Sequence, residues 1–318
     1  MGKDTSIQWC HHTFNGHRGC VHKSLGCLHC YAEAMAKRNP KILGVWGANG
    51  TRVVASEATW KEPLKWDKEA RLAGERHRVF SASLADVFED WVGPMVDARG
   101  NVLHYNSAAT WWVPEETLHG PIAMNFVRKR LFSLVESTPN LDWLILTKRP
   151  GVAANWWRKH PIPANLWQGT SVEDQATANE RIPILLKIPA TVRFLSMEPL
   201  IGPVQVGLYR ATIPKHREHW PTERNNRFWV IVGGESGGKA RPFDIDWARS
   251  IRDECEAAGV PFFMKQLGSN PVENGKPLKL KDHHGGDMGE WPQDLRVREF
   301  PNPDRRAAGL AVITEGRV

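Results

Sequence analysis

The stretch Trp143-Leu-Ile-Leu-Thr147 is continuously apolar until it ends in a hydroxyl, and Trp229-Val-Ile-Val-Gly233 repeats the pattern. Continuous apolar runs fit parallel strands that are buried on both faces better than half-exposed antiparallel strands. Other short apolar runs along the chain are likewise followed by stretches compatible with helices. We therefore predict seven strands, at Ser6–Trp9, Arg78–Ser83, Trp143–Thr147, Leu166–Ser171, Val192–Met197, Trp229–Gly233 and Pro261–Lys265.

The alternation of strands with helices predicts the fold class, which is α/β with a parallel (β/α) barrel, full or partial, of about six to seven strands. We expect a TIM-like barrel domain over residues 1–268, with long insertions at about 40–77, 88–120 and 207–227, and a C-terminal extension over 269–318 packed on it. Two helices have clear limits. One runs from about Tyr31 to Arg38, before Asn39-Pro40, and the other follows a capping Asp244 and ends at Gly259.

Composition narrows the partners and the cellular location. The formal net charge of +7 over 318 residues favours an anionic partner such as a nucleotide, a nucleic acid or a phosphorylated metabolite, although a solvated basic surface is an equal alternative. Four of the five cysteines lie between Cys10 and Cys30, unlike a disulfide framework spread over a secreted domain. Without a long apolar run or an apolar signal segment, we expect a cytoplasmic protein with no membrane partner.

Three cysteines lie close together in the motif Cys20-x6-Cys27-x2-Cys30. Three thiolates can hold three corners of an iron–sulfur cube and leave one iron open to a small molecule, whereas a closed zinc site needs a fourth ligand. Cys10 could supply that fourth thiolate, and nearby histidines add further donors, so zinc stays open as an alternative. Cys255 lies on the apolar face of the last helix and is expected to be core packing.

Polar residues follow the predicted strands. In a barrel, the residues at the carboxyl ends of parallel strands converge on one mouth, where catalytic groups lie. Each group alone could merely cap a helix or supply a turn, but together they predict a site for a polar ligand. The candidates for substrate binding or proton transfer at this site are Asp86, Lys148, Glu198, Glu235 and Lys265.

Ten short motifs are spread over nearly the whole chain. They are Ile7-Gln-Trp9, Gly19-Cys20, Gly26-Cys-Leu-His-Cys-Tyr-Ala32, Leu146-Thr-Lys-Arg-Pro150, Gly169-Thr-Ser-Val-Glu173, Phe194-Leu-Ser-Met-Glu-Pro-Leu200, Gly233-Gly-Glu-Ser-Gly237, Ala240-Arg-Pro242, Phe262-Phe-Met-Lys-Gln266 and Trp291-Pro-Gln-Asp-Leu295. In these motifs the chain resembles a phage-associated family of barrel proteins named for phage gene products thirty-seven and sixty-eight, which is similar to radical S-adenosylmethionine (SAM) enzymes.

The resemblance implies a [4Fe–4S] cluster on Cys20, Cys27 and Cys30, with SAM bound to the open iron. The first gap of this motif is six residues where the superfamily has three, and His29 takes the place of its aromatic residue. By analogy of strand order, Ser81, Ser83 and Asp86 would lie near the SAM amino group, and Ser171 and Glu173 near its ribose. The expected cofactor-binding residues are His29, Tyr31, Ser81, Ser83, Ser171, Glu173, Gly233 and Gly234.

The resulting prediction is a radical SAM enzyme that generates a 5′-deoxyadenosyl radical and modifies a nucleotide, a nucleic-acid base or a related anionic substrate. The resemblance also implies a reductant such as flavodoxin or ferredoxin, and a bacterial or phage-infected host cytosol. One alternative is a nucleic-acid-binding barrel protein with a structural zinc or iron–sulfur site and no SAM chemistry. Another is a redox or zinc-dependent hydrolytic enzyme on the same barrel.

Overall fold

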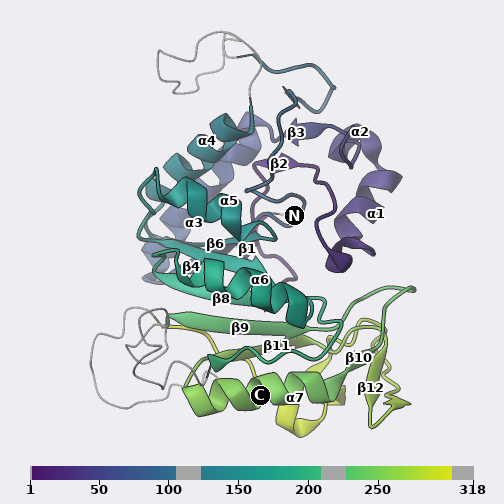
Figure 1. Ribbon diagram of the computed structural model, residues 1–318. Coiled ribbons are helices and arrows are strands. Elements are labelled where there is room, and N and C mark those ends of the chain that lie inside the picture. Colours follow the sequence, from purple (N-terminus) through teal and green to yellow (C-terminus); the bar gives the residue numbers. More distant parts are fainter. Residues whose placement is uncertain (1, 105–122, 209–226, 303–318) are drawn as a thin grey trace. The chain divides into compact units, whose positions relative to one another are not determined.

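The computed structural model describes residues 2–104, 123–208 and 227–302, and the chain divides into two compact units, Met1–Trp167 and Gln168–Val318. Figure 1 labels most of its helices and strands. They are β1 (His12–Thr13), β2 (His17–Arg18), η1 (Leu25–Cys27), α1 (Tyr31–Arg38), α2 (Pro40–Leu43), β3 (Arg52–Val54), α3 (Glu57–Ala73), β4 (His77–Ser81), β5 (Met95–Val96), α4 (Met124–Glu136), β6 (Leu141–Thr147), α5 (Pro150–Trp157), β7 (Leu166–Ser171), α6 (Gln175–Leu186), β8 (Val192–Met197), β9 (Phe228–Gly233), β10 (Phe243–Asp244), α7 (Ile245–Ala258), β11 (Phe262–Gln266), β12 (Pro271–Glu273), β13 (Lys276–Pro277), η5 (Met288–Glu290) and η6 (Gln293–Leu295).

The main sheet has seven strands in the order β1-β4-β6-β7-β8-β9-β11. The pairs β1 with β4, β4 with β6, β8 with β9, and β9 with β11 are all parallel. Strands that follow one another along the chain therefore also follow one another in the sheet, which is the strand order of a (β/α) barrel. The predicted α/β class with parallel strands is confirmed.

In the first unit, β4 and β6 form the centre of the sheet. Val79, Trp143 and Ile145 on these strands have no exposed surface. Helix α3 packs against both strands and buries Trp60 and Trp66. Ser56 caps the start of α3 by accepting a hydrogen bond from the Thr59 N–H at 3.3 Å. Residues 40–77, expected to be an irregular insertion, thus contain α2, β3 and the long helix α3.

The first strand differs from the prediction. Residues 6–9 form bends and turns, and the strand is β1, in which His12 pairs with Val79 and Thr13 with Phe80. His12 and Thr13 are polar and carry no apolar periodicity that predicts a strand. Only their pairing with β4 defines them as one. The predicted strand at Ser6–Trp9 is therefore wrong.

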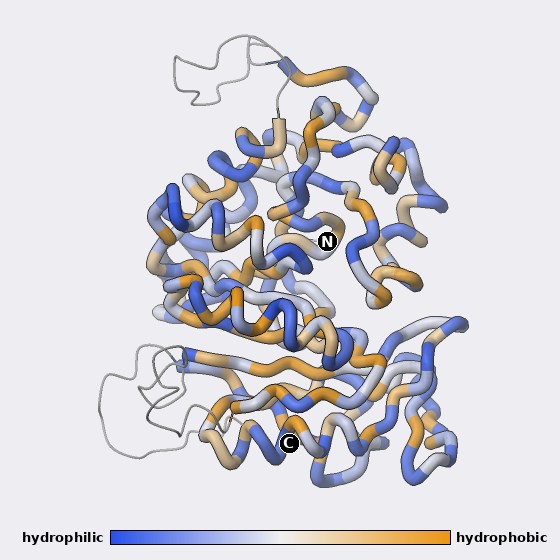
Figure 2. The backbone as a smooth tube through the Cα atoms, in the orientation of Figure 1, coloured by the Kyte–Doolittle hydropathy of each residue, from blue (hydrophilic) through white to orange (hydrophobic). Residues whose placement is uncertain are grey.

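The second unit is built around β8, β9 and β11. Figure 2 shows apolar residues concentrated along β9, whereas α7 carries both apolar and polar residues. Helix α7 packs on β9 and β11 with Ala248, Ile251 and Cys255 completely buried. Asp244 caps its start by accepting from the Asp246 N–H at 3.0 Å, and Gly259 ends it at φ 65°. Both predicted ends of this helix, and the packing role of Cys255, agree with the structure.

The chain after β12 and β13 returns to the edge strand β11. The Met264 N–H donates to the Val297 carbonyl at 2.8 Å, and the Glu299 N–H donates to the Phe262 carbonyl at 2.9 Å. Trp291 is buried and donates from Nε1 to the Gly285 carbonyl at 2.9 Å. Residues 269–302 thus belong to the second unit and contact its edge strand, while the proposed domain boundary at residue 268 stays a prediction.

Two predicted insertions are described only in part. The one at 88–120 contains β5, which pairs with β3, but its residues 105–120 lie outside the described residues. The one at 207–227 lies almost wholly outside them. The helix predicted at Tyr31–Arg38 is present as α1 with the same limits.

Candidate functional site

Asp86 lies after β4 and accepts hydrogen bonds from four donors. Its Oδ1 accepts from the Thr147 hydroxyl at 2.7 Å and from the Phe88 N–H at 3.0 Å. Its Oδ2 accepts from the Lys148 N–H at 3.0 Å and from Arg149 Nη1 at 2.8 Å. A buried carboxylate bound by four donors has a fixed orientation, so Asp86 is arranged to orient its neighbours.

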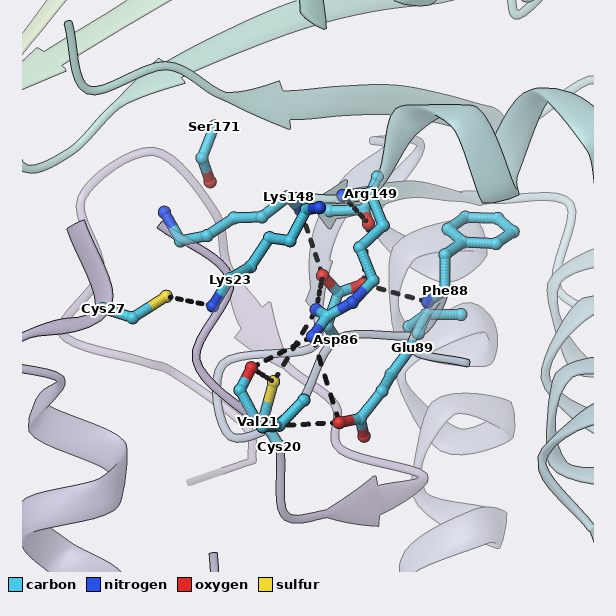
Figure 3. A network of polar contacts seen from close by, with 12 residues as sticks. Cys20, Val21, Lys23, Cys27, Asp86, Phe88, Glu89, Lys148, Arg149 and Ser171 are labelled. Atoms are coloured by element: carbon cyan, nitrogen blue, oxygen red, sulfur yellow. Dashed lines mark hydrogen bonds and ion pairs between the residues drawn. The ribbon is translucent and has the colours of Figure 1, made fainter. Parts of the chain in front are cut away.

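Arg149 connects Asp86 with the cysteine loop. It precedes α5, and its side chain is only 9% exposed. Beyond Asp86, Nη2 donates to the Val21 carbonyl at 3.0 Å, and Nη1 lies 3.9 Å from the Sγ atom of Cys20. Figure 3 shows the guanidinium between Asp86 and the Cys20–Val21 segment. The carboxyl ends of β4 and β6 therefore hold the start of the cysteine loop.

Glu89 holds the same segment from the other side. Its Oε1 accepts from the Val21 N–H at 2.9 Å. Arg52 on β3 donates to both oxygens of Glu89 and lies with its guanidinium carbon 4.0 Å from the centroid of a Trp91 ring. Bidentate pairing with Arg52 fixes the orientation of the Glu89 carboxylate. Glu89 and Arg149 together therefore bind the backbone N–H and the carbonyl of Val21.

The three loop cysteines are reduced and partly buried. Burial, with the charges of Asp86 and Glu89 as further causes, raises the pKa of the Cys20 thiol to about 12, although Arg149 acts against them. Burial also raises the pKa of the Cys30 thiol, which the N–H groups of Glu33 and Ala32 oppose. The Cys27 sulfur accepts a hydrogen bond from the Lys23 N–H at 3.4 Å. Metal coordination would be needed to hold Cys20 as a thiolate at neutral pH.

The donor chemistry of the loop fits an iron–sulfur cluster. Thiolates are the ligands of such clusters, and both the cation beside Cys20 and the N–H donor at Cys27 are suited to negatively charged sulfur. Within residues 2–104, 123–208 and 227–302, no three His, Cys, Asp or Glu side chains are gathered closely enough to bind a metal ion. Cys10, the fourth thiol of the zinc alternative, is buried and directs Sγ at the Ile7 carbonyl at 3.8 Å.

Further predicted cofactor residues lie around the loop. The Tyr31 hydroxyl donates to the Ser83 carbonyl at 2.7 Å, although the side chain of Tyr31 is mostly exposed. The Ser83 hydroxyl accepts from Asn15 at 3.0 Å. His29 is half-buried within the loop.

Ser81 points elsewhere. With His17 and residues of α4 it lines a cavity of about 10 Å³, and its hydroxyl has no hydrogen-bond partner among the described residues. That volume is about the space of one water molecule. The predicted contact of Ser81 with SAM stays a prediction.

In the second unit, Glu198 and Lys265 form an ion pair between the ends of β8 and β11. Gly234 follows β9 where a Cβ atom would come within 2.2 Å of the Leu267 carbonyl oxygen, so only glycine fits there. Gly233 accepts at its carbonyl from the Leu200 N–H at 3.0 Å. These predicted residues therefore lie together at the carboxyl ends of three adjacent strands.

Two other predicted carboxylates of the second unit are bound to arginines. Arg241 donates to Glu235 from Nη2 at 2.7 Å and from Nε at 3.0 Å. Glu173 is completely buried and receives Arg181 Nη1 at 3.3 Å, while the same nitrogen donates to the Ser171 carbonyl at 2.9 Å. In this arrangement each carboxylate is paired with an arginine, and the predicted roles of Glu235 and Glu173 stay predictions.

Three residues of the first unit were not predicted as site residues: Arg52, Glu89 and Arg149. Arg149 follows Lys148 directly at the end of β6, so the rule that selected Lys148 could also have selected it. Arg52 and Glu89 carry no local signal, because each becomes significant only through the other.

A family model matches residues 4–113 and 114–291, which is most of the chain. The chain belongs to this family. Its description reads "Protein of unknown function (DUF5131)", and it carries no phage designation, so the phage association stays a prediction. No curated protein matches this family member.

Solved structures similar to this family member are mutants of spore photoproduct lyase. One, with bound AdoMet and dinucleoside spore photoproduct, has 11% identity and a TM-score of 0.42, with 80% of this chain and 65% of that chain covered. Another, a tyrosine-to-phenylalanine mutant, has 10% identity and a TM-score of 0.47, with 84% and 81% covered. This chain thus spans slightly less than two thirds of the first structure's length.

Over residues 2–104, 123–208 and 227–302, no helix combines the length and the apolar character that crossing a membrane requires.

Proposed function

We propose that this protein is a radical SAM-type iron–sulfur enzyme. Cys20, Cys27 and Cys30 would hold a [4Fe–4S] cluster, and SAM would bind at the iron that they leave open. When bound and reduced, the cluster supplies an electron that cleaves SAM into methionine and a 5′-deoxyadenosyl radical. A small acidic electron carrier such as flavodoxin or ferredoxin would act as reductant, in a cytoplasmic setting.

One observation carries the proposal: Arg149 and Asp86, at the carboxyl ends of β6 and β4, hold the loop that bears the three thiols. In parallel α/β sheets, ligands bind outside the carboxyl ends of the strands. The cysteine loop is therefore fixed at the edge of the sheet where a reaction site is expected.

The chain's own residues would act by position and charge. Arg149 places a cation beside Cys20, and the Lys23 N–H donates to the sulfur of Cys27. Asp86 holds Arg149 in place. The Tyr31 hydroxyl, bound to the Ser83 carbonyl, fixes the residue that follows the third cysteine.

The proposed substrate is a nucleotide, a nucleic-acid base or a related anionic molecule. The net charge of +7 supports an anionic partner. Glu198 and Lys265 form the pair that we propose for substrate binding or proton transfer in the second unit, because both are partly accessible at strand ends.

The test is anaerobic purification with iron and sulfide analysis, followed by reduction with dithionite in the presence of SAM and measurement of 5′-deoxyadenosine. We expect about four irons and four sulfides per chain and production of 5′-deoxyadenosine. Cys27→Ala should lose both the iron and the product. Cys255→Ala, which removes a buried thiol of α7, is the matched control and should retain them.

Two other outcomes decide between the alternatives. One equivalent of zinc without iron would refute the proposal and favour the structural metal site, which salt-dependent binding to nucleic acid would support. Iron and sulfide without cleavage of SAM would retain the cluster and reject the radical mechanism.

A further inference from the structure

The residue that follows the first cysteine is held at both of its backbone polar groups. The Val21 carbonyl accepts from Arg149 Nη2 at 3.0 Å, and the Val21 N–H donates to Glu89 Oε1 at 2.9 Å. Both charged side chains are almost completely buried, with 9% and 3% of their surfaces exposed. Charge-assisted hydrogen bonds between buried groups define a position more strongly than contacts at the surface.

Arg149 is itself held by its neighbours. Asp86 binds Nη1 at 2.8 Å and lies 8% exposed, so the guanidinium cannot turn away without leaving a buried carboxylate without its cation. The same nitrogen lies 3.9 Å from the Cys20 sulfur. One guanidinium therefore both fixes the peptide after Cys20 and presents positive charge to its sulfur.

The contact made by the second cysteine is different in kind. The Cys27 sulfur accepts from a backbone N–H, that of Lys23, at 3.4 Å. A backbone donor carries only a partial charge, whereas a guanidinium carries a full one. The electrostatic environment of the loop is thus unequal, with the fixed cation at Cys20.

We propose that Arg149 is a positioning residue for the cluster. It fixes the Cys20–Val21 segment through its planar fork, and its charge stabilises the more negative, reduced state of the cluster. This inference rests on the proposed function. Hydrogen bonds and nearby charge are among the factors that set the reduction potential of iron–sulfur centres. Lysine would keep the charge but not the fork, so the two parts of the role are separable.

The first measurement uses the metal-free, reduced protein. Amide hydrogen exchange is followed in peptides that contain Val21 for the wild type, Arg149→Lys and Arg149→Gln. We expect exchange at Val21 to be at least ten times faster in Arg149→Gln and clearly faster in Arg149→Lys, because neither side chain can bridge Asp86 and the Val21 carbonyl together. Arg158→Gln is the matched control, since Arg158 is exposed and donates to Asn155 at 2.6 Å; it should leave this exchange unchanged.

The second measurement uses the reconstituted proteins. The midpoint potential of the cluster is measured by titration with detection of the reduced cluster by electron paramagnetic resonance. We expect a more negative potential in Arg149→Gln and a potential close to that of the wild type in Arg149→Lys. If Arg149 acted only in folding, neither the negative shift of the potential in Arg149→Gln nor its restoration in Arg149→Lys would be observed.

The outcomes separate this inference from the proposed function. A wild-type protein that binds no iron refutes the proposed function and the charge role, while the exchange measurement still decides the positioning role. A cluster with the same potential and the same Val21 exchange in all variants refutes the inference and leaves the proposed function standing. If Arg149→Gln does not fold, Arg149→Lys decides: faster exchange with an unchanged potential supports the inference, and unchanged exchange overturns it.

Discussion

Arg52 donates two hydrogen bonds to Glu89, from Nε to Oε2 at 2.5 Å and from Nη2 to Oε1 at 2.7 Å, and both residues are buried. The pair connects β3 with the segment that follows β4. Because Glu89 also accepts from the Val21 N–H, the pair links the cysteine loop to a buried part of the first unit.

Breaking this pair should be costly. Removal of one partner leaves the other as an uncompensated buried charge, so Arg52→Met or Glu89→Gln should lower the free energy of unfolding by about 3–5 kcal/mol. The double variant should lose less than the sum of the two. Urea unfolding of the wild type, the two single variants and the double variant gives the free energies of unfolding for a double-mutant cycle. Losses of free energy that simply add would contradict the coupling between Arg52 and Glu89. Lys65→Ala, which breaks an exposed pair with Glu62, should cost less than about 1 kcal/mol.

A histidine cluster predicts how stability depends on pH. His12 Nε2 lies 3.1 Å from His77 Nδ1, and the Arg78 N–H donates to His11 Nδ1 at 2.8 Å. Burial, with Arg78 and His77 as further causes, lowers the pKa of His11 from 6.5 to about 4. The pKa of His12 is also lowered to about 4, by burial and then by His77.

The sign follows from these two shifts. Between pH 6.5 and 4 the unfolded chain binds protons that the folded chain does not, so the stabilisation is complete above about pH 6.5 and is lost as the pH falls toward 4. With solvent screening taken into account, the loss should be on the order of 1–2 kcal/mol. The charges of Asp4 and Glu69 raise the pKa of His12 and so reduce this loss, whereas the charge of Lys3 lowers that pKa and adds to the loss. Urea unfolding of the wild type and of His11→Asn between pH 4.5 and 7.5 measures the effect; an equal slope in both proteins would contradict it.

Two glycines should respond to alanine with opposite signs. A Cβ atom at Gly169 on β7 would lie 2.3 Å from ring atoms of Phe194, so Gly169→Ala should lower the free energy of unfolding by about 1–3 kcal/mol or more. A Cβ atom at Gly151 in α5 would meet nothing within 4 Å. Gly151→Ala should therefore raise it by about 0.5–1 kcal/mol through the gain in helix propensity. Thermal unfolding compares the two variants, and a stabilising Gly169→Ala would contradict the packing.

The central strands were predictable because their signal is local. Both β7 and β8 begin and end where the apolar runs at Leu166 and Val192 predict. The first strand was not, since His12 and Thr13 carry no apolar pattern and become a strand only by pairing with Val79 and Phe80. Register with a partner is a property of the folded sheet, and no window of sequence contains it.

The same distinction holds for the candidate site. Asp86 and Lys148 could be selected because they follow strands whose carboxyl ends meet at one edge. The ion pairs of the site join residues that are far apart in the sequence. Arg149 and Asp86 are 63 positions apart, and Arg52 and Glu89 are 37 positions apart. Charged residues are usually exposed, so composition alone gave no reason to expect Arg52 inside.

The return of the chain from Val297 to Glu299 along β11 has a consequence for solubility. A parallel sheet that ended at β11 would present the free N–H and C=O groups of that strand to other molecules, which is a common route to strand-to-strand aggregation. Here the N–H of Met264 and the carbonyl of Phe262 are already occupied by Val297 and Glu299. Residues 297–299 thus protect the edge of the main sheet, and a protein shortened to end at Gln266 would lose that protection while keeping all seven strands of this sheet.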